Sequence, residues 1–179
     1  MNHKHIARYG ISLILLTLIF GTIYGTVQQN FRSSANDPQI QMAEDVAYAL
    51  NHGALPETVV SKNQIDIRQS LAPFVVIYDA KGEPLIGSGI LDGKTPRLPK
   101  GVFDSVMRYG EDRVTWQPDK EVRIASVIIP FNSGFILAGR SLREVEKRES
   151  KLEVMITLGW LGCVMLMTAV FFLFRGKEH

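Results

Sequence analysis

Two long apolar runs, one near each end of the chain, dominate its pattern of hydrophobic and polar positions. Tyr9 to Val27 and Val154 to Phe174 contain no charged residue, and each is about 20 residues long, the length that an α-helix needs to cross the hydrocarbon core of a bilayer. We therefore predict five segments, namely an N-terminus (1–8), a first transmembrane helix (9–29), a central domain (30–152), a second transmembrane helix (153–174) and a C-terminus (175–179).

Basic residues beside the two runs predict the orientation of the chain. Lys4 and Arg8 precede the first run, and Arg175 and Lys177 follow the second. Positive charge in short flanking segments favours the cytoplasmic side, so we expect both termini to be cytoplasmic and the central domain extracytoplasmic, in the cytoplasmic (inner) membrane of a bacterium. A cleaved secretory signal is the alternative for the first run. The segment 21–28 contains no alanine and offers a poor cleavage pattern, which favours an uncleaved anchor.

Within the central domain the apolar positions change from a helical to an extended period. Asp37 and Pro38 form a helix start, and apolar residues then recur at spacings of three and four on one face, namely Ile40, Ala43, Ala47 and Leu50. Compact β-branched and aromatic runs separated by turn residues predict five strands and one short helix after the second strand: Phe74–Tyr78, Leu85–Ile90, the helix Val102–Tyr109, Arg113–Gln117, Val122–Pro130 and Gly134–Gly139.

This order predicts an α+β fold, with a long N-terminal helix and an antiparallel sheet of about five strands that carries its helices on one face. Ser141 and Glu144 form a capping-box pattern, and neither glycine nor proline interrupts the chain from Leu142 to Leu158. We therefore expect one helix to run from the last strand into the second apolar run.

The hairpin sequence FVVIYDAKGEPLIGSG, which starts at Phe74, resembles the first hairpin of PAS-like extracytoplasmic sensor domains. These domains, also called PDC or single-Cache domains, occur in bacterial membrane receptors and sensor histidine kinases. The Tyr-Asp-x-x-Gly turn and the order of elements from Asp37 to Glu153 are similar to theirs. The resemblance implies a sheet that cradles a small ligand and a second span that transmits the response. The output modules of that family do not follow Phe174 here, which implies that a separate membrane protein, such as a sensor kinase, receives the signal.

Composition narrows the chemistry of the central domain. Basic and acidic residues are nearly balanced in the chain, 20 against 18, and no basic face of the kind used by nucleic-acid binders is visible. Cys163, the only cysteine, lies in the second apolar run, and His52 is the only histidine between the runs. A cysteine nucleophile and a His/Cys metal cluster are therefore excluded there. We expect no enzymatic activity, no metal and no cofactor.

The best candidates for ligand binding lie on the predicted strands and are Tyr78, Trp116, Arg123, Ser126 and Arg140. Arginines on neighbouring strands can grip a carboxylate or phosphate of a small anionic ligand, with aromatic side chains as walls. The simpler interpretation is that the arginines pair with surface acids and that the aromatic residues belong to the core.

Small residues in the apolar runs are candidates for helix packing. Gly21 and Gly25 form a G-x-x-x-G pattern that Thr17 extends, and Gly159 and Cys163 form a weaker version. Such spacing allows close helix approach, either in a homodimer or between the chain's own two spans.

The sequence thus favours a membrane-anchored, extracytoplasmic, sensor-like domain that binds a small ligand or a partner protein and modulates a membrane partner, without catalytic output. The alternative is a structural scaffold or assembly factor of a bacterial cell-envelope complex. A polar-lined cavity behind Tyr78, Trp116 and Arg123 would favour the sensor, and a closed sheet without a cavity there would favour the scaffold.

Overall fold

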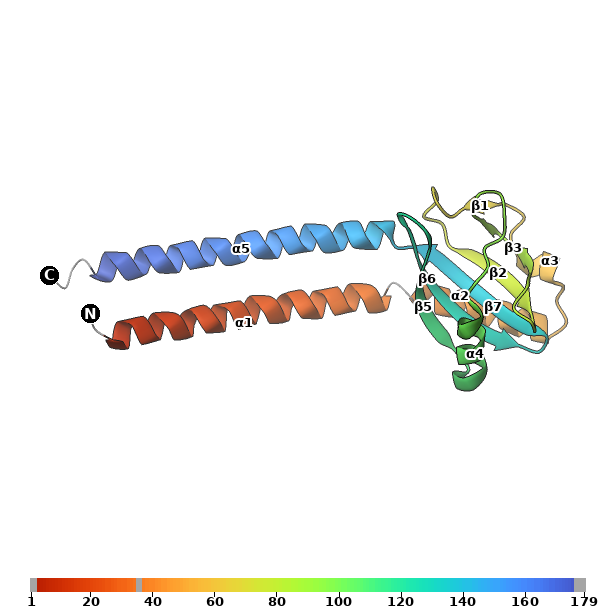
Figure 1. Cartoon of the computed structure of the whole chain (residues 1–179), viewed down its shortest axis with the longest axis horizontal. Coiled ribbons are helices and arrows are strands. Elements are labelled where there is room, and N and C mark those ends of the chain that lie inside the picture. Colours follow the sequence, from red (N-terminus) through yellow and green to blue (C-terminus); the bar gives the residue numbers. More distant parts are fainter. Residues whose placement is uncertain (1–2, 35–36, 176–179) are drawn as a thin grey trace. The chain divides into compact units, whose positions relative to one another are not determined.

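The computed structural model describes residues 3–34 and 37–175, which form two compact units (Figure 1). One unit combines the two ends of the chain, and the other spans Arg32–Val145. The predicted α+β class is confirmed for the second unit, which contains a five-stranded antiparallel sheet.

The end unit consists of most of two long helices, α1 (His3–Ser34) and α5 (Arg143–Arg175), which contain the predicted apolar runs. Both are long and apolar enough to cross a membrane, and their apolar windows are not buried inside the protein. The helices are antiparallel, because α1 contacts α5 through Tyr9 with Thr168 and through Thr17 with Trp160.

Helix α2 (Asp37–Asn51) covers the predicted helical segment and buries the predicted face. Ala43 and Ala47 are buried, and Gln39 and Val46 are buried beside them. The chain turns at Gly53 with a φ of 90°, a left-handed conformation that glycine adopts without steric cost. A short helix that the sequence pattern missed, α3 (Pro56–Val59), follows.

The main sheet has the order β3-β2-β7-β6-β5, and every neighbouring pair is antiparallel. Its strands are β2 (Phe74–Asp79), β3 (Pro84–Gly87), β5 (Asp112–Asp119), β6 (Val122–Phe131) and β7 (Gly134–Ser141). The last strand of the sheet therefore lies at its centre and pairs with the first.

The predicted strand Leu85–Ile90 is divided in the structure. It ends as β3 at Gly87, and β4 (Gly89–Ile90) pairs instead with β1 (Ile65–Asp66) in a separate parallel sheet. The division occurs at Ser88, whose buried hydroxyl accepts a hydrogen bond from the Val75 N–H at 3.1 Å. This side-chain bond, which no periodicity reveals, lies where the ladder between β2 and β3 ends.

The expectation that the helices share one face of the sheet is wrong. Helix α2 covers one face, and α4 (Lys100–Tyr109) packs on the other through Phe103 and Val106 (Figure 1). Strand β2 shows the reason, since it is buried at every position from Phe74 to Tyr78 and presents apolar side chains to both faces. Both faces therefore need a cover.

The predicted continuous helix after the last strand is confirmed, with a shift at its start. Strand β7 extends to Ser141, and α5 begins at Arg143. The Ser141 hydroxyl accepts a hydrogen bond from the Arg143 N–H at 3.3 Å, so it still satisfies one of the free donors at the helix start.

Gly134 supplies a stability test of the strand register, because a Cβ there would overlap the Tyr78 carbonyl oxygen and lie 3.0 Å from the Asp79 Cα. Backbone cannot move aside as a flexible side chain can, so Gly134→Ala should lower the free energy of unfolding by about 1–3 kcal/mol. The control is Gly101→Ala in α4, where no atom lies within 4 Å and alanine should be neutral or stabilising. Urea titration of a fragment of residues 33–150 measures both, and equal stability of the two variants would contradict this register.

Candidate functional site

The five predicted ligand-binding residues divide between the two faces of the sheet. Trp116 pairs with Ile124, and Tyr78 and Ile124 belong to the cluster covered by α4. Arg140 pairs with Ala125, so it shares the opposite face, the one that α2 covers, with Arg123. The arginines therefore do not join the aromatic residues around one ligand. Because side chains alternate between the two faces along each strand, the arginines lie on the face opposite to that of the aromatic residues.

Tyr78 belongs to the core, as the simpler interpretation held. Its side chain is fully buried, its ring packs edge-on against Phe103 at 5.3 Å, and burial raises the pKa of its hydroxyl. The hydroxyl donates a hydrogen bond to the Pro96 carbonyl at 2.9 Å. Tyr78 thus holds the segment 91–99 against the sheet.

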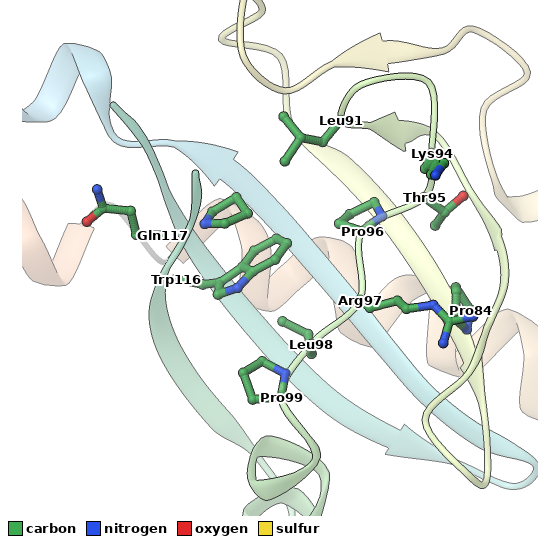
Figure 2. Close-up of a pocket in the computed structure, with 11 residues that line it drawn as sticks. Pro84, Leu91, Lys94, Thr95, Pro96, Arg97, Leu98, Pro99, Trp116 and Gln117 are labelled. Atoms are coloured by element: carbon green, nitrogen blue, oxygen red, sulfur yellow. The ribbon is translucent and has the colours of Figure 1, made fainter. Parts of the chain in front are cut away.

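That segment forms one wall of a groove of about 870 Å³ beside Trp116, which Figure 2 shows in close-up. The lining is mainly proline, leucine and tryptophan, with a few polar residues, and comprises Pro84, Leu91, Lys94, Thr95, Pro96, Arg97, Leu98, Pro99, Trp116, Gln117 and Pro118. The volume lies within the range of about 300–1,000 Å³ that is usual for ligand sites. We take this groove, here named the Trp116 groove, as the candidate functional site.

The wall of the groove is ordered without belonging to a helix or strand. Leu91 and Lys94 exchange two backbone hydrogen bonds of 2.8 and 3.0 Å around Asp92 and Gly93, whose φ values are 51° and 74°. Proline then fixes φ at Pro96 and Pro99. Together with the bond from Tyr78, these constraints give the groove a preformed wall.

Both charged side chains that line the groove are basic. Arg97 forms a two-pronged contact with Glu83, with distances of 3.1 and 2.8 Å, and is therefore already neutralised. Lys94 is exposed and has no acidic partner among the residues that the structure describes. Its ammonium group is available to a bound anion beside an apolar surface.

An ion-pair network, here named the Arg68 bridge, joins the two sides of the groove. Arg68 contacts Asp92 at 3.2 Å and Asp119 at 2.5 Å. Asp92 follows Leu91 on one wall, and Asp119 follows Pro118 on the other. The hydrogen bond from Arg68 lowers the pKa of Asp119, and the same bond raises the pKa of Arg68. Sequence reasoning missed this network because its members lie 24 and 51 positions apart.

The predicted helix-packing residues make different contacts. Thr17 accepts a hydrogen bond from the Trp160 indole at 3.1 Å, and Gly159 lies against Phe20, whose ring carbon would be 3.1 Å from a Cβ. Gly21 and Gly25 have no atom within 4 Å of such a Cβ, and Cys163 is exposed. The two helices therefore meet beside the G-x-x-x-G pattern rather than through it.

Groups suited to metal binding do not gather in the described ranges. No group of three or more His, Cys, Asp or Glu residues there could hold a metal ion. His52 is exposed, and its Nδ1 bonds the Tyr48 carbonyl at 2.7 Å.

Compared with protein-family models, curated proteins and solved structures, the chain shows no match.

Ser126 and Ser88 form a matched pair of buried serines. Ser126 Oγ has no hydrogen-bond partner in the described part of the chain, whereas Ser88 Oγ bonds both backbone groups of Val75. An unpaired hydroxyl in an apolar core destabilises the fold, so Ser126→Ala should leave the free energy of unfolding unchanged or raise it, and Ser88→Ala should lower it by about 1 kcal/mol. Urea titrations of the fragment measure both. A large loss for Ser126→Ala would show that its hydroxyl has a partner.

The Arg68 bridge should make stability depend on pH in the acid range. Because the folded-state pKa of Asp119 is lowered, its stabilising contribution is complete above the unfolded-state value of about 4 and is lost as the pH falls through the folded-state pKa. Arg68→Gln should therefore flatten the acid limb of a plot of stability against pH. Adding Asp119→Asn to that variant should change this limb further only by the smaller contribution of the hydrogen bond that Asp119 accepts from the Lys120 N–H. A curve for Arg68→Gln parallel to the wild type would contradict the bridge.

Proposed function

We propose that this chain is a two-pass membrane protein whose central domain lies outside the cytoplasm, binds a small ligand in the Trp116 groove and modulates a membrane partner. The groove is the observation that carries the proposal. It is preformed, lined by both apolar and polar side chains and close to an available cation, features shared with small-molecule sites.

The surface of the end helices supports membrane anchoring. Large apolar side chains project outward along both apolar windows, and an exposed apolar surface of this extent needs a cover. A hydrocarbon core supplies that cover at the right length. The exposed residues include Ile11, Ile14, Leu15, Leu18, Ile19, Met155, Leu158, Met165, Leu166 and Phe172. The basic residues that flank the runs favour cytoplasmic termini.

The arrangement of elements supports a PAS-like sensor domain. A helix precedes a hairpin of β2 and β3, the short helix α4 follows, and β7 leads directly into α5. The resemblance to PAS-like domains rests on this order of elements together with the hairpin sequence. The Tyr78 to Gly82 turn also closes the hairpin, with Asp79 accepting hydrogen bonds from the backbone N–H groups of Lys81 and Glu83.

The lining predicts the chemical class of the ligand. Trp116, the prolines and the leucines suit an aliphatic or aromatic body, and Lys94 suits a carboxylate. We therefore propose a small organic acid with an apolar body, which replaces the arginine-bound anion that the sequence suggested.

A physical connection links the groove to the start of α5. Arg68 holds both groove walls, and the carbonyl of the next residue, Gln69, accepts a hydrogen bond from Arg143 at 2.9 Å. Leu142 N–H also donates to the Arg123 carbonyl on β6 at 2.9 Å. A ligand that changes the spacing of the walls would act on Arg68 and, through Gln69, on the first residue of α5.

A scaffold without a small ligand is the second candidate function. Met107 and Tyr109 near the end of α4 are 72% and 73% exposed, and large exposed apolar side chains are suited to protein contacts. In that case the domain would present this surface to an envelope complex, and the groove would stay unoccupied by small molecules.

Fluorescence of Trp116 tests the sensor hypothesis. The chain has two tryptophans, and Trp160 lies outside the fragment 33–150, so Trp116 is the only tryptophan of that fragment. Aliphatic and aromatic carboxylates of increasing size should shift its emission with saturation and raise the melting temperature. Lys94→Gln should weaken binding about 5- to 30-fold, the range for loss of a charge-assisted hydrogen bond of about 1–2 kcal/mol.

Met107→Ala, outside the groove, is the control and should bind like the wild type. Saturable binding that Lys94→Gln leaves unchanged would reject the role of Lys94. Absence of binding across the series, with a folded fragment, would favour the scaffold.

A further inference from the structure

The paired end helices leave a second groove of about 420 Å³, lined chiefly by Thr17, Phe20 and Gly21 of α1 and by Glu153, Thr157 and Trp160 of α5. Its lining combines a carboxylate and hydroxyl groups with apolar side chains. We name it the Glu153 groove. It faces outward from a helix pair that is already closed by its own polar contacts, Tyr9 with Thr168 at 2.7 Å and Trp160 with Thr17 at 3.1 Å.

Glu153 lacks a cationic partner in the described part of the chain. It makes no hydrogen bond or ion pair there, and its neighbours one helical turn away are Glu149 and Ser150 on one side and Ile156 and Thr157 on the other. The facing stretch 9–31 of α1 contains no lysine or arginine. Lys151 of α5 lies two positions before Glu153 and therefore on another side of the helix, so no described cation of either helix contacts Glu153.

The position of Glu153 makes the lack of a cationic partner energetically unfavourable. Glu153 immediately precedes the uncharged run Val154–Phe174, so in a membrane it lies where the hydrocarbon core begins. Ionisable side chains at such positions usually pair or face a protein partner, because lipid tails offer no counter-charge. The groove thus presents a carboxylate at the edge of the hydrocarbon core, where it can pair with a cation from another chain.

We propose that the Glu153 groove receives a transmembrane helix of a partner protein, which carries a lysine or arginine level with Glu153. This inference rests on the proposed membrane anchoring and specifies the membrane partner. Gly21 has open space where a side chain would stand, so a third helix can approach closely there. Charge complementarity selects the occupant. A second copy of this chain would instead place one Glu153 against another, and like charges repel.

Synthetic transmembrane helices in vesicles provide the test. The full chain, with Cys163→Ala and a donor dye on Ser61→Cys in the exposed part of the central domain, is reconstituted with acceptor-labelled leucine-alanine helices. These helices carry Lys, Gln or Glu at the level of Glu153. The Lys helix should give energy transfer above the level of random mixing and bind about 3- to 10-fold more tightly than the Gln helix, as polar contacts in membranes do. The Glu helix should not bind.

Two variants separate the groove from simple charge attraction. Glu153→Gln should abolish the preference for the Lys helix. Glu153→Gln with Met155→Glu keeps a carboxylate near the same depth but on another face of α5, where Met155 is exposed, and should not restore the preference. Restoration by this double variant would overturn the proposal, as would equal binding of the Lys and Gln helices.

Two further measurements identify other outcomes. Energy transfer between donor- and acceptor-labelled copies of the chain, without preference for the Lys helix, would show that a second copy occupies the groove and would overturn the proposal. Extraction at alkaline pH and protease protection of the same vesicles test the anchoring separately. If the chain is inserted with its central domain accessible on one side but does not bind the Lys helix, only the proposed partner helix is rejected. A chain that alkali removes rejects the anchoring itself.

Discussion

The pairing of β2 with β7 is the constraint on which the rest of the structure depends. It joins the first and last strands of the main sheet over six register positions, from Phe74 with Gly139 to Asp79 with Gly134. Both glycines are needed for close approach, since a Cβ at Gly139 would lie 2.6 Å from the Phe74 ring and one at Gly134 would overlap the Tyr78 backbone. This pairing creates a sheet with two apolar faces, and α2 and α4 must cover one each.

The Trp116 groove is a consequence of that central pairing. The register buries Tyr78, and Tyr78 then holds Pro96 through its hydroxyl. The segment that carries Pro96 becomes one groove wall, and β5 with Trp116 becomes the other. The Arg68 bridge joins the walls at the surface and borders the residue that anchors Arg143. Buried core residues therefore form the base of the groove. Exposed charges, whose interactions are screened by salt, lie at its surface.

Polar side chains have different roles in the two units. In the central domain the polar side chains of the groove lie above a core whose hydrogen bonds are almost complete, and Ser126 is the buried side chain left without a partner in the described ranges. In the end unit the apolar side chains face outward, and the polar groups Tyr9, Thr17, Thr168 and Trp160 hold the helices together. Glu153 takes no part in that pairing and is therefore available to another protein.

Local patterns by themselves determined the main elements of this protein, though not α3, β1 or β4. The two uncharged runs, the spacing of apolar residues in α2 and the β-branched segments gave the long helices and the five main strands, because each signal is contained in a few neighbouring residues. They did not determine which groups meet. The faces of Arg123 and Arg140, the break at Ser88, the second covered face and the Arg68 bridge all depend on strand order and register.

Of the five predicted ligand residues only Trp116 lines the groove, and Lys94, which does so as well, lies in a proline-rich loop with no periodic signal. Strand order and register bring together residues that are distant in the chain, and a single sequence carries no local record of that pairing. The sequence therefore determined the helices, the strands and the two apolar runs, whereas only the tertiary structure decided where a ligand or a partner helix can bind.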